Sequence, residues 1–273
     1  MSGRDRGLLI SPSVSGNRSV HAGELPSACQ AVEVSKLMIF ADFLRHRRRE
    51  QLSDADLAVL EESVSDVRKT HARQMIAHAG APIGVSTYLM EGFICRYMDD
   101  RNGIRQLVAV HVAGDFVDLH GYPLGRLDHD VATLGVCKIA LVPHQALDRL
   151  VRERPNLTKL LWFSTLLDAA MHREWIFRLG RLDAVARVGH FFCEIEAKLR
   201  AVGLSDGHHF HFPLTQADLG EACGMTSVHI NRMLRELRER KLMQVQRGIV
   251  TIHDLAALRR LSEFDPSYLF IDQ

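Results

Sequence analysis

Basic side chains gather in one short stretch near the C-terminal end of the sequence. Between residues 227 and 247 there are six Lys or Arg and two Glu, so this stretch carries six minus two, or +4, whereas the whole chain of 273 residues carries +1. Guanidinium groups pair with phosphates and give bidentate hydrogen bonds to guanine. The stretch is therefore a candidate nucleic-acid contact, through Arg232, Arg235, Arg238, Arg240, Lys241 and Arg247.

Two capped helices with a glycine between them would hold these side chains. Thr215, with an acidic residue three positions on, is a predicted cap for a short helix over 216–223. Gly224 would provide the turn, and Thr226 would cap a longer helix over 227–241. Apolar residues at helical spacing would form the small core between the two helices: Leu219, Ile230, Leu234 and Leu237. This is the layout of a helix-turn-helix.

The residues that follow predict a β-hairpin. Two short β-like runs in "KLMQVQRGIVTIHD" flank Arg247-Gly248, a pair that suits a tight turn. A helix-turn-helix followed by such a wing is far more specific than either part alone. The alternative is an αα-hairpin whose arginines are only solvated.

The elements upstream change character twice. Residues 37–66 read as helical, with Ser53 and Asp54 as candidate caps of a second helix. From 67 to 143 the sequence is rich in glycine and in short apolar runs, and Asn102-Gly103 is a hairpin signal because both residues tolerate positive φ. The strand-like runs, at 86–100, 104–119 and 131–143, predict a small antiparallel barrel or jelly roll.

A long helix should follow the barrel. Residues 157–179 contain no Pro or Gly and are apolar on most sides, so the helix needs cover on most sides. We expect one side to pack on the barrel and another to pack on the same helix of a second copy; the alternative is a helix buried within a monomer. Gly180 should end this helix and Asp183 should cap the next. Residues 205–213 read as a loop.

Acidic and imidazole side chains gather in the second half of the glycine-rich region. Two imidazoles with carboxylates can hold a metal, and one histidine can ligate haem. Against this, Asp and His in loops are often surface residues or turn caps. Another small molecule, or no ligand, therefore stays open, and no metal ligands are assigned. The residues are Asp115, Asp118, His120, Asp128, His129 and Asp130, of which Asp118, His120, Asp128 and His129 form the candidate effector pocket.

The order of these parts resembles the Crp/Fnr family of bacterial transcription regulators from about residue 37 to the C-terminus. The likeness is strongest over "LTQADLGEACGMTSVHINRMLRELRERKLMQV", and "VAGDFVDL" looks like the family's phosphate-cassette entry. It implies an α+β fold with a β-roll like the cyclic-nucleotide-binding jelly roll, a dimerisation helix and a winged helix-turn-helix. It also implies a homodimer that senses a signal in its roll, binds double-stranded DNA in successive major grooves and has RNA polymerase as a partner.

The resemblance places the base-reading residues at the start of the second helix of the motif. By position they are Ser227, Val228, Asn231 and Arg232, and His229 is well placed for a base or phosphate. Val228 departs from the glutamate of well-known members, so it can contact a thymine methyl but cannot accept from cytosine. The preferred DNA half-site should therefore differ from the best-known operators.

The likeness leaves the effector and cofactor unknown. Leu127-Asp128 aligns where cyclic-nucleotide binders carry Arg-Ser, and an aspartate there repels a phosphate, although Arg126 is adjacent. Cyclic nucleotide is therefore disfavoured. An iron–sulfur cluster is not expected, because only Cys29 lies near the N-terminus. The cysteines are scattered singly, as Cys29, Cys95, Cys137, Cys193 and Cys223, which argues against a disulfide framework.

Together these features predict a cytoplasmic regulator rather than an enzyme. No apolar run reaches the length of a membrane span, and we expect no signal peptide. The rival interpretations are a metal-dependent, cupin-like β-roll enzyme and a dimerisation adaptor that does not read DNA. The expected organisation is an N-terminal extension, a roll with flanking helices, a dimerisation helix, a DNA-binding domain and a tail, over 1–36, 37–150, 151–180, 181–261 and 262–273.

Overall fold

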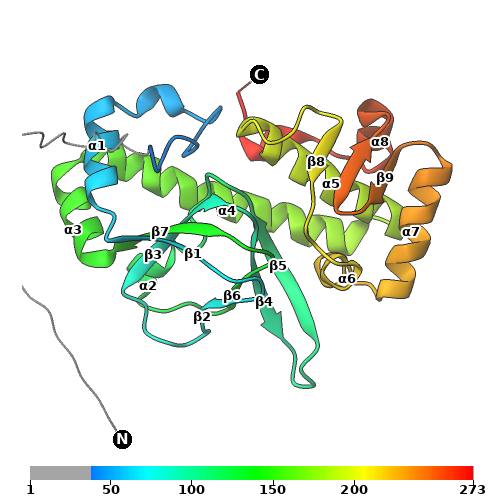
Figure 1. The fold of residues 1–273 in the computed structure, drawn as a ribbon, viewed down its shortest axis with the longest axis horizontal. Helices are drawn as coiled ribbons and strands as arrows, with labels where there is room; N and C mark the ends of the chain where they lie inside the picture. Colours follow the sequence, from blue (N-terminus) through cyan, green and yellow to red (C-terminus); the bar gives the residue numbers. More distant parts are fainter. Residues whose placement is uncertain (1–37, 273) are drawn as a thin grey trace, which may run out of the picture. The chain divides into compact units, whose positions relative to one another are not determined.

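The computed structural model describes residues 38–272, so the predicted extension over 1–36 lies outside the described residues. Two antiparallel sheets form a β-roll (Figure 1). One has the order β1-β7-β3 and the other β2-β6-β4-β5. Apolar side chains fill the space between them, among them Leu89, Ile94 and Val131. The strands are β1 Asp66–Lys69, β2 Met75–Ala77, β3 Val85–Glu91, β4 Ile94–Asp99, β5 Arg105–His111, β6 Asp130–Thr133 and β7 Lys138–Pro143.

The hairpin predicted at Asn102-Gly103 joins β4 to β5. Its last paired residues are Asp99 and Arg105, so the loop covers 100–104. Gly103 is left-handed, with a φ of 75°, whereas the position before it is not. The side chain of Asp100 accepts hydrogen bonds from the backbone N–H groups of 102 and 104. The turn is therefore closed by an aspartate in addition to the glycine.

The helical prediction for 37–66 holds only for its second half. Ser53 caps α1, Asp54–Glu62, by accepting from Asp56 N. Residues 39–48 instead form successive turns, followed by a 3-10 helix, η1, at Arg49–Gln51. Positive φ angles at Leu44, His46 and Arg48 interrupt a regular helix. Phe40 and Phe43 are buried against the rings of Tyr88 and Phe116, so packing on distant strands fixes this irregular path.

Two consecutive helices connect the roll to the C-terminal elements. A short helix, α2 Gly121–Leu124, lies within the β5–β6 connection of the roll. After β7 the roll is followed by α3, His144–Glu153. The long helix α4, Pro155–Arg181, begins with a proline and runs from the roll to the C-terminal elements (Figure 1). Gly180 does not end it: the helix continues to Arg181 and stops where Asp183 caps α5, Ala184–Ala201.

The two sides of α4 have different fates. One is buried within the chain and includes Leu167 and Met171, which are 5% and 9% exposed. The other leaves large apolar side chains in solvent, namely Trp162, Leu166, Ile176 and Phe177. The buried face of α4 packs on the roll and on α5. The rest of the chain therefore covers α4 on one side only.

The C-terminal elements match the helix-turn-helix prediction and extend its wing. They are α6 Gln216–Cys223, α7 Ser227–Glu239, β9 Met243–Gln246, β10 Ile249–Ile252, α8 Leu255–Leu261 and η2 Pro266–Leu269. The loop predicted at 205–213 was wrong in part, because β8, His209–His211, pairs with the free edge of β10. Phe210 in its centre is 3% exposed, and this burial fixes the strand.

No helix among residues 38–272 is long and apolar enough to cross a membrane.

Several ionisable side chains of α5 are buried, and His190 is one of them. Its Nε2 lies 3.1 Å from Oε1 of Glu174 on α4, and its imidazole ring packs against the rings of Phe264 and Tyr268. Burial lowers the pKa of His190 to about 4. The unfolded chain would hold that proton from about pH 6.5 downward. A depressed histidine pKa means that stability is present above pH 6.5 and is lost as the pH falls toward 4.

We therefore predict that His190→Gln flattens the acid limb of the stability curve. Between pH 6.5 and 4 the wild type should lose on the order of 3 kcal/mol through this group, and the variant should not. Urea unfolding at several pH values measures the difference. Glu174, whose pKa burial raises, acts in the opposite direction but is present in both proteins. Parallel curves for the two proteins would contradict the assignment.

Candidate DNA-binding surface and effector pocket

Local capping fixes the two helices of the helix-turn-helix. Thr215 accepts from Asp218 N, and the Asp218 carboxylate accepts from Thr215 N at 2.7 Å, which completes the capping box. Gly224 ends α6 with a φ of 63°, and Thr226 caps α7 by accepting from His229 N. A side chain at Gly220 is excluded, because a Cβ there would lie 2.5 Å from the carbonyl oxygen of residue 225. These contacts hold the helices closely together.

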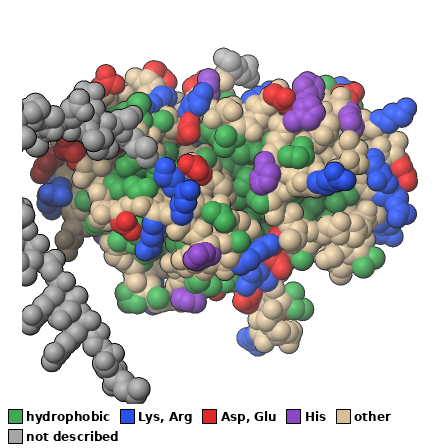
Figure 2. Space-filling view, in the orientation of Figure 1, with side chains coloured by type: hydrophobic (Ala, Val, Ile, Leu, Met, Phe, Trp, Pro, Cys, Tyr) green, Lys and Arg blue, Asp and Glu red, His purple; other side chains and the backbone are tan. Residues whose placement is uncertain are grey.

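One face of α7 builds the short core and the other faces solvent. Ile230, Met233 and Leu237 are buried. The opposite face exposes Ser227, Val228, Asn231 and Arg232, and then Arg235 and Arg238 one and two turns further on. Figure 2 shows Lys and Arg side chains gathered over the end of the molecule where α7 lies in Figure 1. The exposed face of α7 therefore carries polar and apolar side chains in its first two turns and positive charge further along.

Val228 is the most telling residue on this face. It is 80% exposed at the start of α7, so it contributes almost nothing to the core. Asn231 is oriented by a 2.6 Å hydrogen bond from its Nδ2 to Oε1 of Gln216, the first residue of α6. His229 is half-buried beside the cap. An exposed valine next to oriented polar groups is suited to a base edge that carries a methyl group.

The wing turn presents a further cation. Arg247 and Gly248 both have positive φ, 51° and 76°, as in a type I′ hairpin turn. Residue 246 pairs with 249 across the turn, and Arg247 is exposed at its tip. The position of this side chain, on a separate loop from α7, suits a contact with the DNA backbone.

The helix-turn-helix is attached to the roll through α6. Arg73, between β1 and β2, makes a bidentate ion pair with Asp218 at 2.5 and 2.6 Å. The Gln106 amide of β5 donates to the carbonyl oxygen of Glu221. Beside these contacts lies an open hollow between the β4–β5 hairpin and the turn that precedes α7. Sequence reasoning missed this contact, because its partners are 115 and 145 residues apart.

A second hollow separates the roll from α4. It has a volume of about 550 Å³, and the roll lines it with Arg96, His120, Asp128 and His129 among others. The wall from α4 includes Thr165, Asp168, Ala169, His172 and Ile176. The structure thus brings together three of the four predicted effector residues. It also adds Asp168 and His172, which lie about 40 residues later and carried no sequence signal.

Asp118 does not line this hollow, so the expectation that it joins the pocket was wrong. It is buried beneath the roll surface, where its carboxylate accepts from Thr87 N at 2.6 Å. Burial raises the pKa of Asp118 to about 6. Asp115 also serves elsewhere: its carboxylate lies 3.1 Å from Nζ of the buried Lys198. Both carboxylates have structural contacts that a residue pattern cannot reveal.

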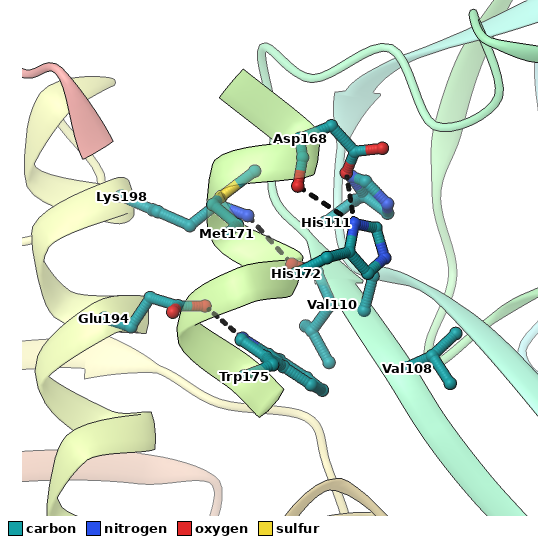
Figure 3. Close-up of a pocket in the computed structure, with 10 residues that line it drawn as sticks. Val108, Val110, His111, Asp168, Met171, His172, Trp175, Glu194 and Lys198 are labelled. Carbon is teal, nitrogen blue, oxygen red and sulfur yellow. Dashed lines mark hydrogen bonds and ion pairs between the residues drawn. The ribbon is translucent and has the colours of Figure 1, made fainter. Parts of the chain in front are cut away.

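The polar network behind the pocket joins the roll to α4 and α5. The Arg96 guanidinium donates to Asp168 at 2.5 Å, and His120 Nδ1 lies 3.9 Å from the same carboxylate oxygen. Figure 3 shows Asp168 and His172 on α4 beside His111 of the roll, with Trp175 donating to Glu194 of α5. The Lys198 ammonium donates to Val110 O at 2.8 Å, seen in the same view.

Both pocket imidazoles are neutral at neutral pH. Burial, with help from the nearby Arg96 guanidinium, lowers the pKa of His120 to about 3 and lowers that of His129. Where a cyclic-nucleotide site would need cations, the roll places the buried apolar Leu127 and the carboxylate of Asp128. Arg126 is exposed and does not line the hollow. The chemistry of the walls favours ligation by neutral nitrogen over capture of a phosphate.

The described cysteines, Cys95, Cys137, Cys193 and Cys223, are buried and unpaired, while Cys29 lies outside the described residues. Burial raises the pKa of Cys95 and Cys193 to about 12. These four thiols therefore act as small core side chains.

The comparisons with known proteins agree with this arrangement. Residues 186–261 match the model of the Crp-like helix-turn-helix domain. The "Anaerobic regulatory protein" of Pasteurella multocida (strain Pm70) is 24% identical over 90% of this chain and 86% of its own length. The "Fumarate and nitrate reduction regulatory protein" of Escherichia coli (strain K12) is 22% identical over 90% of this chain and 94% of its length.

Solved structures show the same fold. FixK2 from Bradyrhizobium japonicum superposes with a TM-score of 0.67 at 18% identity, covering 73% of this chain and 98% of FixK2. The c-di-GMP responsive regulator CLP from Xanthomonas campestris gives a TM-score of 0.60 at 14% identity, covering 74% and 99%. A β-roll, a long helix and a winged helix-turn-helix together define a DNA-binding transcription regulator. Residues 186–261 carry a Crp-like helix-turn-helix domain, and most of the chain is similar in sequence and in fold to regulators of the Crp/Fnr type.

The ion pair between Arg73 and Asp218 gives a prediction about the attachment of α6. Arg73→Ala should lower the free energy of local opening of α6 by about 1–2 kcal/mol, a value discounted because Arg73 is partly solvated. The α6 amides should then exchange their hydrogens about tenfold faster, while the amides of the roll core stay unchanged. Arg101→Ala, at an exposed site in the hairpin loop, is the matched control. Equal α6 exchange in both variants would show that the pair does not hold the helix.

Proposed function

We propose that this regulator binds a palindromic operator as a homodimer, with α7 of each copy in the major groove. The observation that carries the proposal is the outward face of α7. Its first two turns expose Ser227, Val228, Asn231 and Arg232 with no role in the core. In this motif the N-terminal turns of the second helix point at base edges. We take residues 181–261 as the DNA-binding unit.

The proposed roles follow from the chemistry of each side chain. Arg232 gives a bidentate contact to guanine, Asn231 reads adenine, and Val228 contacts a thymine methyl. Ser227 and His229 contact bases or phosphates beside the cap. Arg247 at the wing tip, with Arg235 and Arg238, pairs with phosphates and sets the orientation of the domain on the duplex.

We propose that the exposed side of α4 is the dimer interface. Trp162, Leu166, Ala169, Arg173 and Ile176 follow one another at alternating steps of four and three residues, the spacing of a coiled-coil seam. Four large apolar side chains in solvent on one helix are costly unless they are covered. A twofold pairing of α4 would cover them and place two copies of α7 on one side of the dimer.

The signal in this proposal enters through the hollow between the roll and α4, and the output is a change in DNA affinity. RNA polymerase is the expected partner at the promoter and the cytoplasm is the expected location. The names of the matched relatives are those of regulators, which supports this role over the cupin-like enzyme. The exposed face of α7 supports it over an adaptor that does not read DNA.

The reading of DNA is tested by selecting sites from random duplexes with the purified protein. The selected sites should be palindromes with half-sites about 34–36 Å apart. Arg232→Ala should lose about 1–3 kcal/mol of binding free energy per half-site and relax the preference at one guanine. Arg247→Ala should weaken all sequences alike and reduce the salt slope by about one unit. An unchanged guanine preference with Ala at 232 would refute its role.

The dimer is tested with residues from each side of α4. Leu166→Glu combined with Ile176→Glu should give a folded monomer by sedimentation, with loss of tight binding to a palindrome. Leu167 and Met171 are unsuitable for this test because they belong to the core. Leu167→Ala is instead the control, and should cost about 2–5 kcal/mol of stability while leaving the folded fraction dimeric. A dimeric double-glutamate variant would exclude this interface.

A further inference from the structure

We propose that His120, His129 and Asp128 form a binding site for one divalent transition-metal cation of the zinc type. The three side chains reach the same side of the hollow from two segments of the roll, the one before α2 and the one before β6. One possible ligand atom from each lies within 4.8 Å of the other two. Two imidazole nitrogens and one carboxylate oxygen are a ligand set that such ions prefer.

The orientation of His129 is the strongest support. Its side chain is only 7% exposed, and its Nδ1 lies 2.8 Å from Oδ1 of Asp128. Its Nε2 is buried and has no hydrogen-bond partner among the described residues. A buried polar nitrogen without a partner is costly, and a metal ion satisfies it.

His120 faces the same space. Its ring centroid lies 5.2 Å from that of His129, with the ring planes tilted by 37°. Its Nδ1 is 3.9 Å from Asp168 Oδ2, so Asp168 is in place to orient this second imidazole. Because Arg96 neutralises Asp168, the negative charge left at the cluster is that of Asp128. A dication would contact one carboxylate and two imidazole nitrogens, so its charge would meet one negative charge at the cluster.

The side chain of Asp128 is not needed by the fold. It is 83% exposed, whereas Leu127 beside it is buried in the roll. A carboxylate that contacts a buried imidazole from a solvent-exposed position is suited to close over an ion that enters from the hollow. Three protein ligands leave a coordination position for water or a small molecule. The hollow of about 550 Å³ in front of the cluster has room for either.

The site also lies where it can act on the rest of the molecule. Asp168 is followed by Ala169, and both line the hollow. Ala169 belongs to the exposed stripe of α4, the row of residues from Trp162 to Ile176 proposed above as the dimer interface. Gln106, which donates to Glu221 O of α6, lines it too. A metal-dependent change in DNA affinity rests on the proposed function, whereas metal binding itself does not.

The test is titration of the full chain, stripped with a chelator, with Zn²⁺ and with Co²⁺. We expect one ion per chain by elemental analysis after gel filtration, a rise in melting temperature, and a visible Co²⁺ spectrum typical of nitrogen and oxygen ligands. His120→Ala combined with His129→Ala should abolish all three. Asp128→Asn should weaken binding about 10–100-fold. Because Asp128 is exposed, this variant reports on the site even if the double histidine variant does not fold.

The matched control removes another pair of histidines. His209 and His211 alternate on β8, so both point to the same exposed side and can bind metal adventitiously. His209→Ala with His211→Ala should leave the single tight ion in place. Loss of the ion in this control, full binding by Asp128→Asn, or no retained ion in the wild type would each overturn the proposal.

The same preparations separate this inference from the proposed function. Metal-free protein that binds a selected palindrome but retains no Zn²⁺ would overturn the metal site alone. Protein that holds one Zn²⁺ at His120 and His129 but binds no DNA at low salt would keep the site and overturn the DNA-binding role.

Discussion

The buried ion pair between Arg96 and Asp168 holds the β-roll and α4 together. Arg96 is 1% exposed, and a buried guanidinium requires partners: Asp168 at 2.5 Å and Val117 O at 2.6 Å. Removing one member of such a pair costs about 3–5 kcal/mol, because the other charge is left uncompensated. The pair fixes β4 to α4, and the same carboxylate lies beside His120. The position of α4, and therefore the direction of its exposed stripe, depends on this contact.

A similar constraint places the helix-turn-helix. The last carbonyls of a helix have no partner within it. In α6 three consecutive ones, at 221–223, accept from three other elements: Gln106 of β5, Arg178 of α4 and Arg187 of α5. The arginines also place positive charge at the negative end of the helix dipole. The end of α6 thus joins the roll, the long helix and α5 at one point, just before the turn that starts α7.

Much of the DNA-binding motif could be predicted from sequence, because its determinants are local. Thr215, Gly224 and Thr226 act within three residues of themselves, through capping and a positive φ. The wing turn at Arg247-Gly248 is equally local. The strand β8 was missed because it depends on a free edge of β10 some 40 residues later. Residues 38–48 were predicted helical because their apolar spacing fits a helix, but an aromatic cluster with distant strands decides their path.

The effector pocket was harder to predict for the same reason. Its roll residues are close in sequence, so His120, Asp128 and His129 were found as a group. The burial of Asp118 could not be predicted from the sequence. The residues next to it in the sequence do not distinguish a carboxylate that accepts from Thr87 N from one that faces a pocket. Asp168 and the division of α4 into a buried and an exposed face required the packed structure. The apolar residues on most sides of α4 predicted that the helix needs cover, but not which of them are covered by the same chain.

The arrangement sets a condition on how any effector can act. A ligand shifts an equilibrium only by contacting two states differently. In this molecule the hollow is lined by residues of both output elements: Ala169 and Ile176 belong to the exposed stripe of α4, and Gln106 is bonded to the end of α6. A ligand in the hollow would therefore contact both α4, the helix proposed to pair two copies, and Gln106, which bonds to the end of α6. Because coupling is reciprocal, a ligand of the hollow that changes the affinity for DNA by a given factor would have its own affinity changed by DNA by the same factor.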